Sequence, residues 1–261
     1  ALAIIDLKGD FIASTENTDS EADRSAGGGS AGVKKVVDNL NSRRVNSSYG
    51  CAYYPWVTIR DTINGDLVNV PPSVVALGVF GTTEITDDLW FAPAGFNRGG
   101  LSLGAGGLPV VAVKDKLTSK DRDKLYEANI NPIASFPAEG IVVFGQKTLQ
   151  VTRSALDRIN VRRLLIFVKK EISRIANTIL FDQNVQATWD RFVSAVRPVL
   201  EDIQSRFGLT SFKVLLDETT TTPDLIDRNI LYAKVFLQPA RSIEFIAVDF
   251  IINNTGAGFA D

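Results

Sequence analysis

The sequence has 261 residues, of which 45% are hydrophobic, and this is enough to build a sizeable core. Its 28 basic and 30 acidic residues nearly cancel, so the overall charge does not indicate a nucleic acid or an anionic membrane as partner. Histidine is absent, which excludes Ser-His-Asp, Cys-His and ordinary zinc sites, and the single cysteine, Cys51, excludes an intrachain disulfide and fits a reducing compartment.

The two ends of the chain give two further expectations. The longest apolar runs, around Ile4 and Ile246, are interrupted by charged residues and are much shorter than the roughly 20 residues that a spanning helix needs. We therefore expect no direct membrane insertion. The chain opens on Ala1 without a basic leader and contains no methionine, so we expect a fragment from which a natural N-terminal portion is missing.

The first quarter of the chain predicts a strand, a loop, a helix and a second strand. Residues 1–5 are strand-like, and the polar tract 15–23 is expected to be a surface loop. Apolar residues then recur at i, i+3, i+4 and i+7 from Val33, which predicts an amphipathic helix ending near Arg44. Residues 53–59 are aromatic and β-branched and predict a strand, although Pro55 argues against a central position in a sheet.

The middle of the chain is less regular. Residues 74–80 fit either a short helix or a strand, and periodicity does not decide between them. The glycine-rich stretch 99–107 predicts a loop, a short helix begins at Ser119, and residues 141–144 predict a strand that ends at Gly145.

Two long helices and several strands follow. The first helix, over residues 154–178, has the strongest apolar stripe in the chain, and the second ends at Gly208 and contains Pro198, which predicts a kink. Strands are expected over residues 212–216, 231–237 and 242–252. Helices between strands predict an α/β or α+β fold, with a mixed β-sheet flanked by helices.

No motif carries catalytic or cofactor chemistry. The spacing of Gly27 and Gly32 resembles a phosphate-binding loop, but Val33 stands where the lysine is needed. The run from Gly104 resembles a dinucleotide fingerprint until Pro109 replaces its last glycine. The carboxylate pairs at residues 87–88 and 121–123 read as exposed turn and helix-start acids. We expect no enzymatic activity, metal or cofactor.

The helix over residues 154–178 carries a lopsided charge. Six basic residues project opposite its apolar stripe, with two acids nearby, which favours an acidic partner over an ordinary solvated face. The six are Arg158, Arg162, Arg163, Lys169, Lys170 and Arg174.

Blocks in a fixed order resemble the contractile tail sheath proteins of myophages, whose relatives occur in pyocins and other contractile injection systems. The number, order and spacing of the blocks make the resemblance specific, and it covers nearly the whole chain. They are residues 53–57 (YYPWV), 70–73 (VPPS), 91–99 (FAPAGFNRG), 121–126 (DRDKLY), 130–132 (INP), 145–148 (GQKT), 157–163 (DRINVRR), 238–243 (QPARSI) and 256–259 (GAGF).

The resemblance implies a structural subunit that polymerises helically around a tail tube and contracts to drive the tube through the host envelope. It implies a virion tail location after assembly in the host cytoplasm. The partners would be further copies, the tail tube protein, and baseplate and tail terminator proteins. Residues 93–261 would be the conserved inner C-terminal domain and residues 1–92 part of the middle domain. A bacteriocin or secretion-type sheath stays open, and a nucleotide-dependent enzyme is the rival class.

Two interfaces are predicted on this basis. The apolar segment with Ile246, Val248, Phe250 and Ile252 is expected to pair as a strand with the sheet of a neighbouring subunit, because an exposed strand edge would otherwise be a liability. Arg158, Arg162 and Lys169 are expected to face the tail tube. The other flank, Arg163, Lys170 and Arg174, is expected to face the tube or a neighbouring subunit.

Overall fold

Residues 50–54 form the strand around which the first half of the fold is built. In the computed structural model, which describes residues 1–7, 31–61, 63–102 and 109–244, every residue of β2 (Gly50–Tyr54) is buried. Cys51 and Tyr53 point into one hydrophobic core, and Ala52 and Tyr54 into another. Because successive side chains of a strand alternate between its faces, β2 must be covered on both sides.

β2 is a central strand of a four-stranded sheet in the order β1-β2-β6-β7. β1 (Ala3–Asp6) and β6 (Ile130–Phe136) flank it in parallel, and β7 (Gly140–Val143) pairs with β6 in antiparallel orientation. The expectation that Pro55 keeps this strand away from the centre of a sheet is wrong. Proline lacks the N–H that a ladder needs, but β2 ends at Tyr54, one residue before it.

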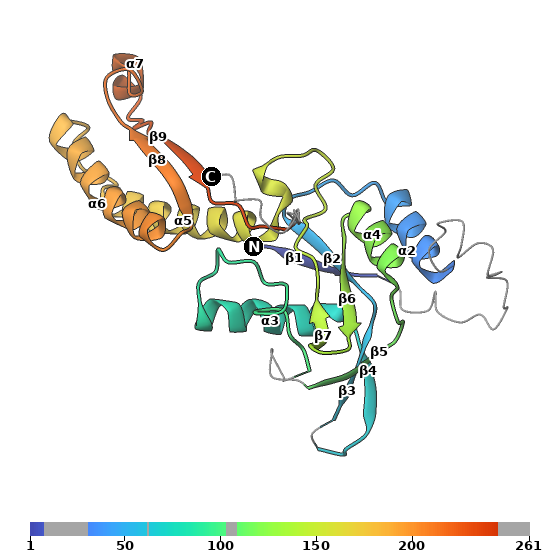
Figure 1. Ribbon diagram of the computed structural model, residues 1–261. Helices are drawn as coiled ribbons and strands as arrows, with labels where there is room; N and C mark the ends of the chain where they lie inside the picture. The colour runs from blue at the N-terminus through green and yellow to red at the C-terminus, as the bar shows by residue number, and fades with distance from the viewer. Residues whose placement is uncertain (8–30, 62, 103–108, 245–261) are drawn as a thin grey trace, which may run out of the picture.

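Helices cover both faces of this sheet (Figure 1). α2 (Ala31–Ser42) and α4 (Ser119–Glu127) pack on the side of Ala52, and α3 (Pro72–Thr86) packs on the side of Cys51. Residues 74–80, for which the sequence left helix and strand open, therefore belong to a helix.

A second, three-stranded sheet has the order β4-β3-β5, all antiparallel. Its strands are β3 (Val57–Arg60), β4 (Leu67–Val70) and β5 (Val110–Val113). The single strand predicted over residues 53–59 is thus divided at Pro55 between two sheets. Val57 and Ile59 face the same core as Cys51, so this sheet helps to enclose α3.

The part of the chain from α5 (Ile159–Thr178) to β9 (Lys234–Pro239) extends away from the sheets described above as an arm, on the left of Figure 1. Two long antiparallel helices and a two-stranded sheet enclose their own hydrophobic core there. The elements are a short 3-10 helix (Ala155–Asp157), α5 (Ile159–Thr178), α6 (Gln186–Ser205), β8 (Leu209–Leu215), α7 (Pro223–Asp227) and β9 (Lys234–Pro239).

Trp90 joins the arm to the sheet region. It lies in the core of the arm, its indole N–H donates to the carbonyl of Arg206 (2.9 Å), and its own carbonyl accepts from the amide of Asn160 (3.2 Å). A Cβ at Gly208 would lie 3.1 Å from the Trp90 ring and 2.6 Å from Ile203, so only glycine fits there without a shift.

The described residues do not separate at the predicted domain boundary between residues 92 and 93. β2 lies before it and β6 after it, yet they are neighbours in one sheet. The core that contains Cys51 also includes Ile133 and Ile159. The two parts therefore share one sheet and one core, and the boundary stays a prediction about how the family is organised.

The fold class predicted from the sequence is confirmed, because several sheets are flanked by helices in a mixed α+β arrangement. Residues 242–244 are described but lie outside any strand, and the rest of the strand predicted over residues 242–252 falls outside the described residues. Pro198 lies inside α6, and its kink stays a prediction. Within the described ranges, no helix has both the length and the apolar character required to cross a membrane.

Substitution of Asn131 would test how much its buried hydrogen bonds stabilise the four-stranded sheet. This fully buried amide donates to the carbonyls of Ala52 (3.1 Å) and Lys147 (2.8 Å) and accepts from the N–H of Lys147 (2.6 Å). Asn131→Leu would leave these buried groups without partners, so we expect the free energy of unfolding to fall by about 3 kcal/mol. Chemical denaturation would measure the change. Asn97→Leu, at an exposed position, should stay within about 0.5 kcal/mol of the wild type, and equal effects would contradict this role.

Candidate functional site

The ionisable groups of the described residues form no recognisable catalytic constellation. In the described part of the chain, no group of three or more His, Cys, Asp or Glu residues gathers as a metal site would require. Cys51 is fully buried, and burial raises the pKa of its thiol to about 12, so the thiol stays protonated at neutral pH. Gly27 and the run from Gly104 to Leu108 fall outside the described residues.

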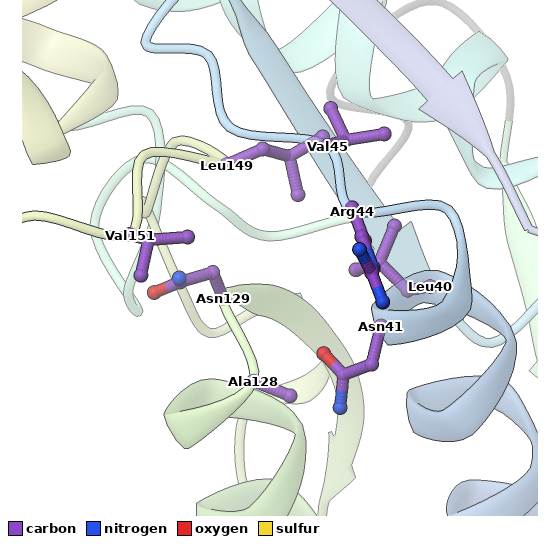
Figure 2. Close-up of a pocket in the computed structure, with 8 residues that line it drawn as sticks. All are labelled: Leu40, Asn41, Arg44, Val45, Ala128, Asn129, Leu149 and Val151. Atoms are coloured by element: carbon purple, nitrogen blue, oxygen red, sulfur yellow. The ribbon is translucent and has the colours of Figure 1, made fainter.

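A hollow of about 270 Å³ lies between the ends of α2 and α4, and Figure 2 shows the residues that line it. Arg44 and Asn129 have positive φ angles of 48° and 61°, where each helix gives way to the next segment. This lining contains no carboxylate, thiol or hydroxyl group, so it offers no acid/base pair or nucleophile. The lining residues are Leu40, Asn41, Arg44, Val45, Ala128, Asn129, Leu149 and Val151.

The expectation of one exposed basic face on α5 is wrong for Arg162. Its side chain is only 6% exposed, donates to the hydroxyl of Ser48, and lies over the ring of Tyr49 with the guanidinium carbon 4.1 Å from the centroid. The chain segment before β2 covers this side of the helix. A residue buried in this way cannot contact a tube.

Arg163 is also held inside the subunit. Its guanidinium donates to the carbonyl of Phe80 (3.1 Å) and to the carboxylate of Glu84 (3.1 Å), and it lies 5.0 Å from the centre of the Phe80 ring. Burial lowers the pKa of Arg163, while Glu84 opposes that shift. This arginine therefore packs α5 against α3 and is not available on an outer flank.

Arg158 binds the C-terminal segment of its own chain. Its guanidinium makes a bidentate contact with Glu244, with Nε and Nη2 at 2.6 and 2.8 Å from the two carboxylate oxygens. Burial is the largest single influence and lowers the pKa of Arg158, but the hydrogen bond to Glu244 and the nearby charges of Glu244 and Asp157 together outweigh it, so the pKa is raised. Arg158 is therefore held in an intrachain ion pair, and its predicted contact with the tube stays a prediction.

Glu244 is the centre of a polar cluster that sequence reasoning missed. Besides Arg158, its carboxylate accepts from the hydroxyl of Tyr126 (2.8 Å) and from the amide of Gln146 (3.2 Å). Tyr126 is in α4, Gln146 follows β7, and Arg158 precedes α5, so one carboxylate joins three segments. The partners of Glu244 lie 86 to 118 positions away from it in the chain, so no local sequence pattern indicates these contacts.

Three basic residues of α5 remain on the surface. Lys169, Lys170 and Arg174 are exposed, and Arg174 pairs with Glu171 one turn earlier (2.9 Å). They lie beyond the first turns of the helix, where the arm has left the sheet region. The exposed basic surface of α5 is therefore smaller than predicted and consists of these three side chains.

The small sheet of the arm has free edges. Among the described residues β8 pairs only with β9, so each strand has one side without a strand partner. Val235 and Leu237 of β9 pack on the arm's core, while Phe236 is 53% exposed. Two strands alone are marginally stable, and the open edges can accept a further strand. The predicted pairing residues Ile246, Val248, Phe250 and Ile252 lie outside the described residues.

Sequence comparison identifies tail sheath proteins as relatives. The chain is 38% identical over 226 residues to the tail sheath protein of Vibrio phage KVP40 and 35% identical over 239 residues to that of Enterobacteria phage T4. Each match covers 87% of this chain, but 32% and 35% of the respective relatives. The chain thus spans about a third of the length of the curated relatives it matches.

Solved structures with the same fold are contractile injection assemblies. The sheath complex of an extracellular contractile injection system (PVC) in the contracted state has a TM-score of 0.72 and 26% identity, covering 82% of this chain and 59% of that one. The contracted helical sheath of the anti-feeding prophage (AFP) has a TM-score of 0.68 and 27% identity, covering 79% and 56%.

The similarity therefore extends over both the sheet region and the arm. Residues 151–253, which include α5, α6 and the small sheet, match the phage tail sheath C-terminal domain family. The chain is similar to contractile tail sheath proteins, and its match to their C-terminal domain family covers residues 151–253.

Proposed function

We propose that this chain is a structural subunit of a contractile tail sheath, which polymerises helically around a tail tube and contracts to drive the tube through the host envelope. The observation that carries the proposal is similarity over 87% of the chain to two phage tail sheath proteins, together with the shared fold of contracted sheaths. Contacts that do not close into a ring generate open helical polymers, so this work needs no catalytic site.

The proposal extends to location and partners. The subunit belongs to the virion tail, assembles in the host cytoplasm, and contacts further copies, the tube, and the baseplate and tail terminator proteins. Residues 93–261 form the inner domain and residues 1–92 part of the middle domain. A sheath of a bacteriocin or other injection system is the second candidate, because the AFP and PVC assemblies share the fold. Electron microscopy of the full-length protein tests the phage sheath and the second candidate together. Short tubular polymers are expected for both, and their absence would contradict both.

We further propose that neighbouring subunits exchange a strand. The tail after Glu244 carries the alternating apolar residues Ile246, Val248, Phe250 and Ile252, and β8 and β9 offer open edges on which such a strand can pair. Main-chain hydrogen bonds would hold the subunits together in the extended and the contracted lattice.

Deletion of residues 245–261 tests the strand exchange. We expect polymers to disappear in electron micrographs while the thermal midpoint of the monomer stays close to the wild-type value, because Glu244 and its partners are retained. A full-length control with Ile246, Val248, Phe250 and Ile252 all replaced by Asn should fail in the same way. Normal sheaths from either variant would refute the exchange.

The tube contact is now assigned to the exposed basic residues. Lys169, Lys170 and Arg174 are exposed on the side of α5 that faces away from the arm's core. Exposed ion pairs are worth only ~0.2–1 kcal/mol each and are screened by salt, so many subunits together would hold the tube while each releases it easily.

Charge reversal at Lys169 and Lys170 tests this contact. Lys169→Glu with Lys170→Glu should reduce the length of sheath assembled on purified tubes, and high salt should reduce wild-type assembly in the same way. Arg197→Glu, at an exposed position of α6, is the matched control and should assemble normally. Arg162→Glu is unsuitable, because a buried reversed charge would unfold the domain. Equal effects at Arg197 and at the two lysines would argue against a tube contact.

A further inference from the structure

A second pocket, of about 330 Å³, lies where the C-terminal segment meets the sheet region. Its walls come from residues 92–95, α4, Pro132 of β6, residues 144–146 after β7, and residues 242–244. Ala92, Ala94 and Phe144 provide apolar surface, while the polar lining includes Arg122, Gln146 and the acidic residues Asp123 and Glu244. The site is thus mixed in character and is built from five separate segments.

A buried hydrogen-bond acceptor in this pocket has no partner among the described residues. Gln146 is 3% exposed, and its amide nitrogen donates to Ser242 and to the carboxylate of Glu244. A carboxylate can only accept, so these contacts fix the orientation of the amide and leave Oε1 as the free acceptor. In the described part of the chain, this oxygen makes no hydrogen bond. Because an unpaired buried acceptor is unfavourable, the pocket favours a donor from outside these residues, and a main-chain N–H of a bound segment would provide one.

An exposed aromatic patch continues from the pocket. The rings of Phe96, Phe136 and Phe144 lie 5.1 to 5.6 Å apart between centroids, and Phe96 and Phe144 are 50% and 41% exposed. Arg122 lies 5.1 Å from the centre of the Phe136 ring, and no acid pairs with it among the residues that the structure describes. The surface therefore fits a partner with an aromatic ring, a main-chain N–H and a negative charge.

We propose that the pocket and the aromatic patch receive residues 256–261 from the C-terminal tail of a neighbouring copy of this chain. Phe259 would pack on the aromatic patch, a main-chain N–H beside it would donate to Gln146, and Asp261 would approach Arg122. Gly256, Ala257 and Gly258 would let the backbone come close to the pocket wall. This inference rests on the proposed strand exchange and assigns the end of the exchanged tail.

The reach of the tail is consistent with this assignment. β9 ends at Pro239 and the pocket wall begins at Ser242, so a strand added to the small sheet passes near the pocket. If residues 246–252 occupy the sheet edge, residues 253–259 can span about 23 Å at roughly 3.3 Å per residue. The same tail can therefore fill both sites on one neighbour.

Disulfide trapping between two separately made proteins tests the proposal. Full-length Phe144→Cys and full-length Phe259→Cys are mixed, assembled and oxidised, so that a covalent dimer can form only between copies. Asp123→Cys, at the exposed rim of the same pocket, replaces Phe144→Cys where loss of a ring prevents assembly. Phe207→Cys, which is 77% exposed and lies after α6, is the matched control. Buried Cys51 is common to all variants.

We expect covalent dimers in mixed sheaths with a pocket cysteine and none with Phe207→Cys. Sheaths that form normally without a dimer from either pocket variant would overturn the inference and leave the proposed function standing. A disulfide that forms within a single Asp123→Cys, Phe259→Cys chain but never in mixtures would place the tail in its own pocket and would also overturn it. Failure of the wild-type protein to polymerise would instead contradict the proposed function, and this inference with it.

Discussion

α5 belongs to two hydrophobic cores, and the rest of the structure depends on this. Its first residue, Ile159, is buried in the core of the sheet region, whereas Leu164, Val168 and Ile175 are buried in the core of the arm. A continuous hydrogen-bonded helix cannot bend sharply without disrupting its own ladder, so α5 sets the direction of the arm relative to the sheets. Trp90, at the junction, makes hydrogen bonds with both α5 and the turn after α6.

This double burial explains why the basic face could be predicted only in part. The apolar period of α5 predicted its end at Thr178, although the helix begins at Ile159 and not at Ser154. A helical wheel, however, separates one face of a helix only from the opposite face. At the start of α5, other segments cover the outer face as well, with Tyr49 against Arg162 and Phe80 against Arg163. Farther along, nothing described covers Lys169 and Lys170. A helical wheel therefore predicts which side chains are exposed only where a helix is packed on one side.

Local patterns predicted most helices and strands, whereas contacts between distant segments could not be predicted. Pro55 argued against a central strand, and the sequence did not indicate that its two sides join different sheets, because strand pairing is a property of the assembled fold. Glu244 appeared to be an interruption in an apolar strand, yet its carboxylate binds Arg158, Tyr126 and Gln146. A single sequence shows neither the partner of a charge nor the segment that buries it.

The position of Glu244 in the chain gives its contacts a mechanical consequence in the proposed sheath. A strand held by a neighbour pulls on the residue where the tail leaves its own subunit. Four hydrogen bonds reach the Glu244 carboxylate from the segment before α5, from α4 and from the loop after β7. Charge-assisted, bidentate contacts with little exposed surface resist such a pull better than one surface ion pair does. Tension in the tail would therefore pass into the sheet region and α5 together, and the small sheet of the arm would not have to carry it alone.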